Sequence, residues 1–544
     1  MRKSLRFLVA GVALFAGLPS AQAQIYKVTL TPQNEIPPTA SSATGSAIIT
    51  LNSTTHEMRV VGTFSNLVGN STAAHVHCCL VQPANTPVAT TTPSFPGFPL
   101  GVRSGSFDRT YDMRLAATWN APFITGNGGT PAGAEAAFIA GVAAGQAYLN
   151  YHSSTFGGGE IRGFLVRNVF ANTSGLSDGA KNAATVLDTL GAGTGLLSNA
   201  LVSLVSMSAT SEAAAIEKLT PQASRGARVV AAEFATSAFD QVSDHVGALR
   251  VGDDKSFALL SGLNGLSGAD NGVWASIYGL SGRQGRDGNF AGYKNAGWSV
   301  TGGYDHELES EAYIGALVSY GNSIVSYRNQ SNGDKDKISS TLVSLYASKD
   351  FSSVYVDGMI GYAWQKYKSR RDTGISGIAG SAYNGHLWGL RVGGGAPLAV
   401  SSSVSLTPQV RVDWDSVKQD AYTETGGGPM ALTVAAKSAD RFRGSLGAQV
   451  DFAGNSSDVR ARPYVRVFWQ HDFQNGGLDS SATFASGGAA FVTPGQKLAS
   501  DQIAAGVGLI LYAQHAFSAA VTYDATLAKD YVSHAYQAKA RWSF

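Results

Sequence analysis

The last eleven residues, HAYQAKARWSF (534–544), alternate between two kinds of side chain. One side of an extended chain would carry three aromatic residues, which are Tyr536, Trp542 and Phe544. Lys539 and Arg541 would fall on the other side. Because successive side chains of a strand point to opposite faces, this segment predicts a strand with one apolar face and one charged face.

The same alternation recurs in twelve stretches from residue 272 to the end of the chain. They are 272–283, 293–307, 311–328, 336–350, 353–369, 380–400, 403–418, 431–451, 458–473, 499–514, 516–527 and 534–544. Short connections alternate with long ones, which are 284–292, 329–335, 370–379, 419–430, 474–498 and 528–533. In hydrocarbon no backbone N–H or C=O can stay unpaired, so a membrane-spanning sheet has to close. Short turns alternating with long loops are typical of bacterial outer-membrane barrels. A 12-stranded transmembrane β-barrel is therefore predicted, with a water-soluble β-sandwich as the alternative.

The composition supports a β-rich membrane protein and excludes several other classes. Charged residues make up only 14% of the chain, against about 25% in ordinary soluble proteins. Glycine accounts for 64 of 544 residues, which suits a sheet with tight turns. The net charge of +2 gives no electrostatic reason to expect nucleic acid as a partner. The apolar run at 7–18 is too short to cross a bilayer as a helix, and no stretch of 18 or more apolar residues occurs elsewhere.

The N-terminus reads as a secretory signal peptide. Arg2, Lys3 and Arg6 precede an apolar run at 7–18. The small residues of Ala21-Gln22-Ala23 predict cleavage between Ala23 and Gln24. We therefore expect an exported protein.

The remaining chain divides into two regions of different texture. Residues 24–170 contain alternating stretches separated by Pro, Gly and Asn, which indicate an antiparallel, Ig-like β-sandwich. Residues 171–250 carry apolar residues at helical spacing, including Val230, Phe234 and Ala238. Such an amphipathic helix would suit a polar-walled tube, so the last part of this linker is expected inside the barrel lumen. The predicted organisation is a signal peptide (1–23), a sandwich (24–170), a helical linker (171–250) and a barrel (251–544), in a mostly β chain.

Residues 272–544 resemble the autotransporter β-domain, the translocator of type V secretion. The resemblance rests on RPYVRVFWQHDF (462–473), on the terminal segment ending in Phe544, and on IEKLTPQA (216–223) ahead of the barrel. It implies residence in the outer membrane lipid with the N-terminal region at the cell surface. It also implies contact with periplasmic chaperones and with the barrel assembly machinery, for which Tyr536, Trp542 and Phe544 would form the assembly signal.

Residues 24 to about 167 resemble the CHRD domain, named for chordin. The matching motifs follow in order as NEIPP (34–38), AAHVHCC (73–79), PSFPGFPLGVRSGSFD (93–108) and GQAYLNYHSSTFGGGEIRGFL (145–165). The signature residues of the last stretch are Tyr148, Asn150, His152, Gly159, Glu160, Arg162 and Gly163. The resemblance favours a binding or adhesion module with an extracellular ligand that the sequence does not identify.

Three histidines offer an alternative chemistry for this region. His75 and His77 share one face of a predicted strand, and His152 lies on another strand of the same motif set. Three converging neutral imidazoles would suit Zn²⁺ or Cu²⁺. The other interpretation is that these histidines form structural hydrogen bonds at a sheet rim.

The neighbouring polar and sulfur groups leave several interpretations open. Cys78 and Cys79 could ligate a metal, form a disulfide between adjacent residues, or remain buried thiols. Glu160 and Arg162 share a face, which favours a structural ion pair over a ligand-binding carboxylate.

Catalytic motifs are sparse. GLSDG (175–179) matches G-x-S-x-G, the nucleophile-elbow pattern, but stands at the start of the helical region without a βα sheet. No P-loop and no H-E-x-x-H sequence occurs. The sequence therefore predicts that the protein is not an enzyme.

Overall fold

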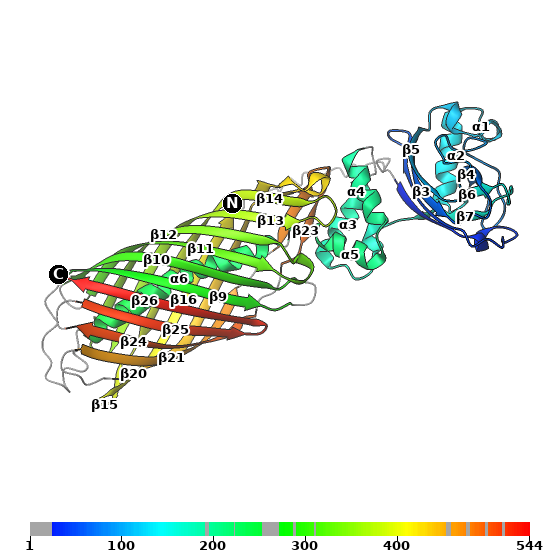
Figure 1. Cartoon of the computed structure of the whole chain (residues 1–544). Coiled ribbons are helices and arrows are strands. Elements are labelled where there is room, and N and C mark those ends of the chain that lie inside the picture. Colours follow the sequence, from blue (N-terminus) through cyan, green and yellow to red (C-terminus); the bar gives the residue numbers. More distant parts are fainter. Residues whose placement is uncertain are drawn as a thin grey trace, which may run out of the picture. The chain divides into compact units, whose positions relative to one another are not determined.

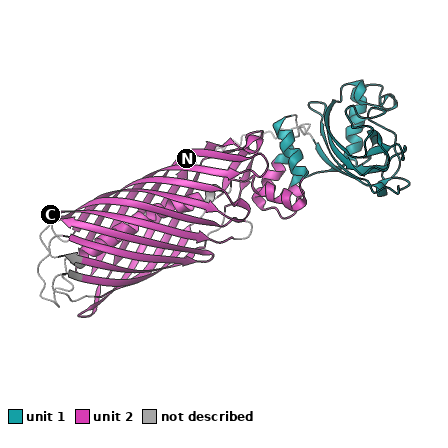
Figure 2. Cartoon of the chain, in the orientation of Figure 1, with its two compact units in different colours: residues 1–170, 187–206 teal, residues 171–186, 207–544 magenta. Residues whose placement is uncertain are grey.

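The computed structural model describes residues 24–190, 195–221, 223–252, 271–286, 290–308, 312–452, 459–474, 479–495, 499–513 and 517–544. The chain forms two compact units (Figures 1 and 2). The first contains the chain up to Phe170 together with Leu187–Ser206, and the second contains Ala171–Val186 with Met207–Phe544. The predicted signal peptide, including Ala23, lies outside the described residues.

Two antiparallel sheets form the N-terminal unit. The larger has the strand order β5-β3-β2-β1-β8, and the smaller has the order β4-β6-β7. Their strands are β1 (Gln24–Leu30), β2 (Thr44–Asn52), β3 (Glu57–Ser65), β4 (Ser71–Cys78), β5 (Gly105–Asp112), β6 (Ala147–Ser153), β7 (Ile161–Phe164) and β8 (Val166–Arg167). Alternate residues of both sheets, such as Val60 in β3 and Val76 in β4, are fully buried in one core. This arrangement matches the predicted antiparallel sandwich.

Two helices between β5 and β6, which the sequence pattern did not predict, also belong to this unit. They are α1 (Ala121–Gly126) and α2 (Pro131–Ala143). Thr130 caps α2 by accepting a hydrogen bond from Gly133, and Pro131 occupies the first position, where proline is tolerated. Alanine and glycine on all sides of α2 obscure the apolar periodicity, although Phe138 and Val142 enter the core.

Four helices follow, namely α3 (Asp178–Leu190), α4 (Leu196–Val205), α5 (Ala209–Glu217) and α6 (Ala223–Gly252). Ser177, the serine of the G-x-S-x-G match, accepts a hydrogen bond from Ala180 at the start of α3 and donates one to Glu217. This serine therefore has a helix-capping role. Among the described residues, no helix has both the length and the hydropathy needed to span a bilayer.

Twelve antiparallel strands close into a barrel, which confirms the predicted fold class (Figure 1). They are β9 (Asn271–Gln284), β10 (Tyr293–Leu308), β11 (Ala312–Tyr327), β12 (Lys335–Phe351), β13 (Val354–Asp372), β14 (Ile378–Gly395), β16 (Val404–Gln419), β20 (Lys437–Phe452), β21 (Val459–Gln474), β24 (Asp501–Ala513), β25 (Phe517–Ala528) and β26 (Tyr531–Ser543). Closure occurs where β26 pairs with β9, from Tyr531 opposite Gln284 to Ser543 opposite Gly272.

The barrel wall alternates as the sequence predicts. Trp364 points outward and is 53% exposed, whereas Tyr367 points inward and is 1% exposed. In the last strand Tyr536 and Trp542 are exposed, and Lys539 is buried on the lumen side. An apolar exterior around a polar interior is the pattern of a barrel in lipid.

One connection and two strand stretches differ from the sequence-based expectation. The predicted long loop at 528–533 is wrong, because only Lys529 and Asp530 separate β25 from β26. The stretch 380–400 divides into β14 and a short strand β15 (Leu398–Ser401). The beginning of the stretch 431–451 leaves the barrel, and the barrel strand starts only at Lys437.

The two longest loops build a small sheet of their own at the long-loop end of the barrel. Its order is β17-β19-β22-β23. Its strands are β17 (Tyr422–Thr423), β19 (Leu432–Val434), β22 (Ser480–Phe484) and β23 (Gly487–Thr493), and β18 (Thr425–Gly426) pairs with β14 nearby. Arg371 of β13 donates to Glu424 and to the carbonyl oxygen of Met430, which ties this sheet to the wall.

Helix α6 lies in the barrel lumen (Figure 1). Its apolar stripe, including Val230, Phe239 and Val242, packs with the inward residues of the wall. Gly226, near its start, lies beside Tyr327 at the long-loop end, and Arg250, near its end, reaches Asp350 at the short-turn end. The chain therefore runs the whole length of the lumen.

Candidate functional site

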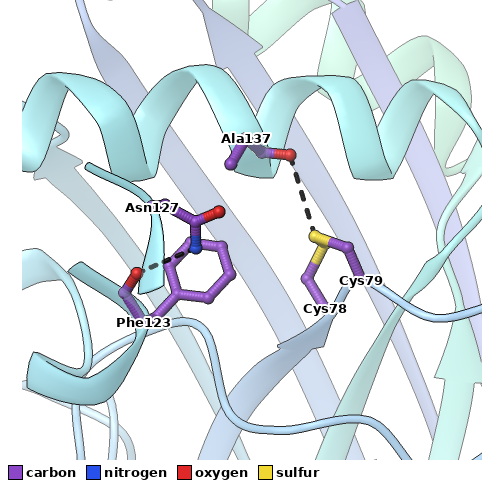
Figure 3. The surroundings of a disulfide bond; sticks show 5 residues. All are labelled: Cys78, Cys79, Phe123, Asn127 and Ala137. Atoms are coloured by element: carbon purple, nitrogen blue, oxygen red, sulfur yellow. Dashed lines mark hydrogen bonds between the residues drawn. A yellow bond between two sulfur atoms is a disulfide. The ribbon is translucent and has the colours of Figure 1, made fainter. Parts of the chain in front are cut away.

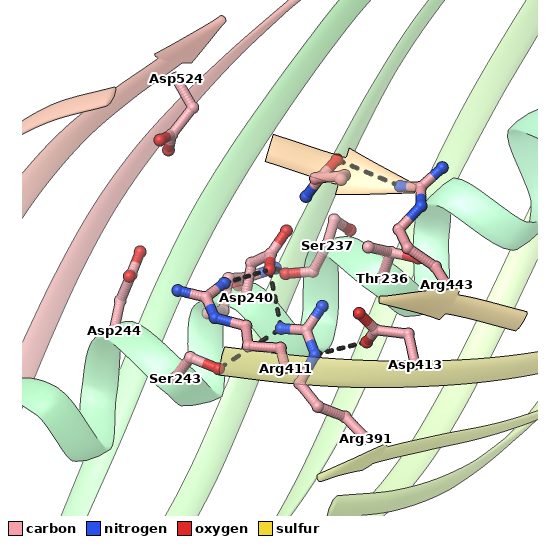
Figure 4. A network of polar contacts seen from close by, with 12 residues as sticks. Thr236, Ser237, Asp240, Ser243, Asp244, Arg391, Arg411, Asp413, Arg443 and Asp524 are labelled. Carbon is pink, nitrogen blue, oxygen red and sulfur yellow. Dashed lines mark hydrogen bonds and ion pairs between the residues drawn. The ribbon is translucent and has the colours of Figure 1, made fainter. Parts of the chain in front are cut away.

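Ion pairs between the wall and α6 hold the helix in the lumen (Figure 4). Arg391 of β14 donates to Asp413 of β16 at 2.6 Å and to Asp240 of α6 at 2.7 Å. Arg466 of β21 donates to Asp524 of β25 at 2.7 Å and also contacts Asp244 of α6. Each arginine joins one carboxylate of the wall to one of the helix. The acidic residues on the polar face of α6 thus bind arginines at inward-facing positions of the wall.

A second anchor lies nearer the short-turn end. His245 of α6 is hydrogen-bonded to Asp305 of β10 at 2.9 Å, and its ring stacks on Trp274 of β9 with the centroids 4.7 Å apart. Arg541 of the last strand donates to the same carboxylate at 2.6 Å. The lumen-facing position that the sequence predicts for Arg541 therefore closes a network across the barrel seam.

The three predicted histidines come together on the outer face of the smaller sheet in the N-terminal unit. His75 and His77 lie on β4, and His152 lies on the neighbouring strand β6, where it is opposite Ala73. One ring nitrogen from each lies within 4.8 Å of the other two. A tetrahedral Zn²⁺ with bonds of about 2.0–2.1 Å requires nitrogens about 3.3 Å apart, so small side-chain rotations would bring them to ligand distance.

The hydrogen bonds of these rings leave the converging nitrogens free. Nδ1 of His77 is 2.6 Å from the carbonyl oxygen of Thr86, and Nδ1 of His152 is 3.1 Å from that of Gly157. Their Nε2 atoms, and Nδ1 of His75, are buried and have no hydrogen-bond partner among the described residues. Backbone carbonyls that receive the second ring N–H are the usual outer partners of metal-binding histidines.

Burial keeps the three rings neutral at physiological pH. It lowers the pKa of His75 to about 3, with smaller contributions from the two other imidazoles, and lowers the pKa of His77 to about 4 despite the opposing hydrogen bond to Thr86. Burial also lowers the pKa of His152. Neutral imidazole is the form that binds a metal ion, so each ring offers a lone pair without first losing a proton.

A buried polar layer adjoins the histidines, and much of it comes from the CHRD signature residues. Asn150 lies opposite His75 in the sheet register, and within the described part of the chain its Oδ1 atom has no hydrogen-bond partner. Glu35, whose pKa burial raises to about 7, has an unpartnered Oε1 atom. A side chain on Gly159 would meet both residues at under 3 Å, so this layer requires glycine there. Glu35 was not predicted; it lies in the NEIPP motif, but nothing in the sequence brings it toward the strands.

Arg162 and Glu160 do not form the expected pair. Arg162 is fully buried and donates to Asn85 and to the carbonyl oxygen of Pro83, with the carboxylate of Glu35 at 4.0 Å. Glu160 instead accepts hydrogen bonds from Ser41 and from the backbone of Val68, both at 2.6 Å. Glu160 precedes β7, which begins at Ile161, and the two side chains bind different loops that cover the sheet.

Tyr148 links Arg162 to the histidine cluster. Its ring stacks on His77 with the centroids 4.6 Å apart, and the guanidinium carbon of Arg162 lies 4.5 Å from the Tyr148 ring centroid. Gly163 follows in β7, where a side chain would meet the backbone of Thr29 at 2.3 Å. Tyr148, Arg162 and Gly163 therefore pack and position this layer.

Cys78 and Cys79 form a disulfide between adjacent residues (Figure 3). Both sulfurs face Gly141 of α2, and Sγ of Cys79 lies 3.7 Å from the carbonyl oxygen of Ala137. β4 ends at Cys78, so Cys79 does not continue onto the histidine face. The disulfide is the outcome among the three alternatives, and the cysteines take no part in the histidine cluster.

The second unit is thus a closed 12-stranded barrel with a helix in its lumen, and the first is a separate two-sheet unit. Residues 273–524 match the family model described as "Autotransporter beta-domain", and residues 26–165 match "CHRD domain". The barrel therefore belongs to the autotransporter β-domain family and the N-terminal unit to the CHRD family. This places the barrel in the outer membrane, as predicted.

Several proteins are similar to this chain over the barrel region. "Outer membrane protein A" of Rickettsia conorii is 24% identical over 284 residues, which are 50% of this chain and 14% of the relative. "Outer membrane protein B" of Rickettsia typhi is 24% identical over 325 residues, which are 56% of this chain and 20% of the relative. "Lipase 1" of Photorhabdus luminescens is 23% identical over 39% of this chain and 33% of its own length. The chain thus spans only a minor part of these relatives.

Among solved structures, the translocator domain of autotransporter NalP from Neisseria meningitidis is similar to 57% of this chain. The match covers 98% of the NalP domain with 19% identity and a TM-score of 0.44. The β-domain of the Bordetella autotransporter Brka covers 51% of this chain and 100% of its own, with 16% identity and a TM-score of 0.41.

Proposed function

We propose that this protein is an autotransporter that displays its CHRD domain at the cell surface as a binding or adhesion module for an extracellular ligand. The observation that carries the proposal is the path of α6 through the lumen. Its N-terminal end lies at the long-loop end of the barrel, which is extracellular in barrels of this kind. The residues that precede it in the chain therefore continue on the outer side.

Contacts of the linker at that end support the same topology. Lys218, which follows α5, donates to Asp372 of β13 at 2.6 Å, and Asn182 of α3 donates to the carbonyl oxygen of Val492 in β23. We propose that the signal peptide is cleaved after Ala23, and that periplasmic chaperones and the assembly machinery receive the barrel. The exposed Tyr536, Trp542 and Phe544 would provide the signal for assembly.

An epitope tag between Gly128 and Gly129, both exposed beyond α1, tests display. On intact cells we expect antibody to bind this tag. A matched tag after Ser402, in a short turn on the opposite side of the membrane, should bind antibody only after permeabilisation. A Gly128 tag that also requires permeabilisation would disprove display, while the Ser402 tag verifies that the envelope is intact.

We propose as a second candidate function that His75, His77 and His152 bind Zn²⁺ or Cu²⁺. It is supported by three neutral imidazoles whose unpartnered nitrogens converge. Within the described residues no carboxylate or cysteine joins these three nitrogens, so a tetrahedral ion would keep one position for water or an external ligand.

Metal titration of the full chain in detergent micelles tests this site. After treatment with a chelator, the wild type is expected to take up one Zn²⁺ or Cu²⁺ per chain. His152→Gln should weaken binding at least about 100-fold, or about 2.7 kcal/mol, because it removes one of three ligands. The control is His56→Gln, since His56 pairs with Glu135 away from the cluster. Equal uptake by wild type and His152→Gln would rule out the site.

A further inference from the structure

The outer surface of the barrel carries a dense group of cations at its long-loop end. The group, called here the rim cations, consists of Arg283, Lys294, Lys335, Lys337, Lys366, Lys368 and Arg370. All are exposed, and they occupy outward positions of β9, β10, β12 and β13. They therefore point away from the lumen and toward the surrounding membrane.

The strand register places these cations directly opposite one another. Lys337 faces Lys368, and Lys335 faces Arg370, across the β12–β13 pair. Arg283 faces Lys294 across the β9–β10 pair. Like charges in directly opposed positions destabilise an antiparallel pair. Three such pairs in one patch indicate that something outside the protein supplies the compensating negative charge.

No carboxylate of the chain does so, as far as the described residues show. None of the rim cations takes part in an ion pair or a side-chain hydrogen bond among the described residues. Asp372 lies in line with them at the end of β13, but its carboxylate binds Lys218 of the linker. Asp336 points into the lumen and is fully buried.

The opposite side of the barrel is different. There the outward Asp501 of β24 is hydrogen-bonded to His471 and Trp469 of β21. Lys418 of β16 is exposed, but it lies opposite His386 and Ser438 rather than another lysine or arginine. The unpaired positive charge is thus concentrated on one side.

Aromatic residues lie directly below the rim cations on the same outward face. Trp298 of β10, Tyr320 of β11 and Trp364 of β13 are about half exposed. Trp364 is two residues, one outward position, from Lys366. Tryptophan and tyrosine collect at the boundary between hydrocarbon and lipid headgroups. The rim cations therefore lie at the level of the headgroups.

We propose that the outward rim of β9–β13 binds the phosphorylated headgroup of a lipid in the outer leaflet. Phosphate suits the opposed lysines and arginines because one group with two negative charges can lie between two cations. The aromatic residues beneath would contact the upper part of the acyl chains. A soluble anion would contact only the rim cations and not the aromatic residues beneath them.

Lipid-dependent melting of the full chain in neutral detergent micelles tests the proposal. We expect dioleoyl phosphatidic acid, but not dioleoyl phosphatidylcholine, to raise the melting temperature of the wild type by several degrees. The double variant Lys337→Ser/Lys368→Ser should show less than half of this shift. Native mass spectrometry should show fewer retained phosphatidic acid molecules on the variant.

Two controls distinguish lipid binding at the rim from a general effect of removing positive charge. Lys418→Ser removes an outward lysine with no opposed lysine or arginine and should keep the full shift. Without phosphatidic acid, the double variant should melt at or above the wild-type temperature, because a repulsive pair is gone. If that variant does not fold, Arg283→Ser/Lys294→Ser tests the second opposed pair. A full shift in the rim variants would overturn the proposal, and so would an equal shift caused by inorganic phosphate.

Discussion

Replacing Arg162 with Met is expected to destabilise the CHRD unit by about 3–5 kcal/mol. Arg162 is fully buried, and its guanidinium satisfies Asn85 and the carbonyl oxygen of Pro83. Methionine fills a similar volume but leaves these acceptors without a donor and Glu35 without its nearest cation. A loss of this size is a large part of the free energy of unfolding of an ordinary domain.

Urea-dependent proteolysis of the full chain in micelles measures this effect, because protease cleaves the N-terminal unit only where it has unfolded. Arg167→Met is the matched control, since Arg167 is exposed in the edge strand β8. The control should change the urea midpoint little. If both variants lost the same stability, the buried contacts of Arg162 would not be the cause.

Replacing Arg391 with Met is expected to loosen α6 from the barrel wall and to cost about 3–5 kcal/mol. Asp413 is buried and would lose the guanidinium that lies 2.6 Å away. Asp240 of α6 would lose its contact at 2.7 Å. The expected result is a lower melting temperature of the barrel in micelles and faster protease cleavage of α6.

The double variant Arg391→Met/Asp413→Leu distinguishes a lost ion pair from lost packing. It removes the stranded carboxylate together with its partner, so it should recover most of the lost stability. Asp240 is partly exposed, with 37% of its side chain accessible, and water can solvate it. A double variant no more stable than Arg391→Met would show that the uncompensated charge at Asp413 is not the source of the loss.

The barrel could be predicted because each strand has to satisfy one local rule. Outward positions such as Trp364 meet lipid and inward positions such as Gln365 meet the lumen, so polarity alternates along the sequence. The loops contact neither lipid nor lumen in a regular order, so their sequences show no such alternation. Residues 431–436 show the alternating pattern of a strand, and Leu432–Val434 do form one. This strand pairs with another loop rather than with the barrel.

The histidine cluster was predictable only in part. The spacing of His75 and His77 fixes their common face, and a shared motif set suggested His152. The carbonyl partners at Thr86 and Gly157 come from loops that fold back over the sheet, and no periodicity signals such loops. For the same reason the sequence pattern pairs Arg162 with Glu160, two residues away, rather than with Glu35, which is distant in sequence.

The bond between Cys78 and Cys79 has a topological consequence for export. A disulfide between neighbouring residues encloses no segment of the polypeptide, unlike a bridge between distant cysteines, which turns the intervening chain into a covalent ring. Oxidation of these cysteines in the periplasm would therefore leave the unfolded polypeptide linear, without a covalent loop. If the domain crosses the outer membrane as we propose, it would need neither a reductant before crossing nor an oxidant afterwards.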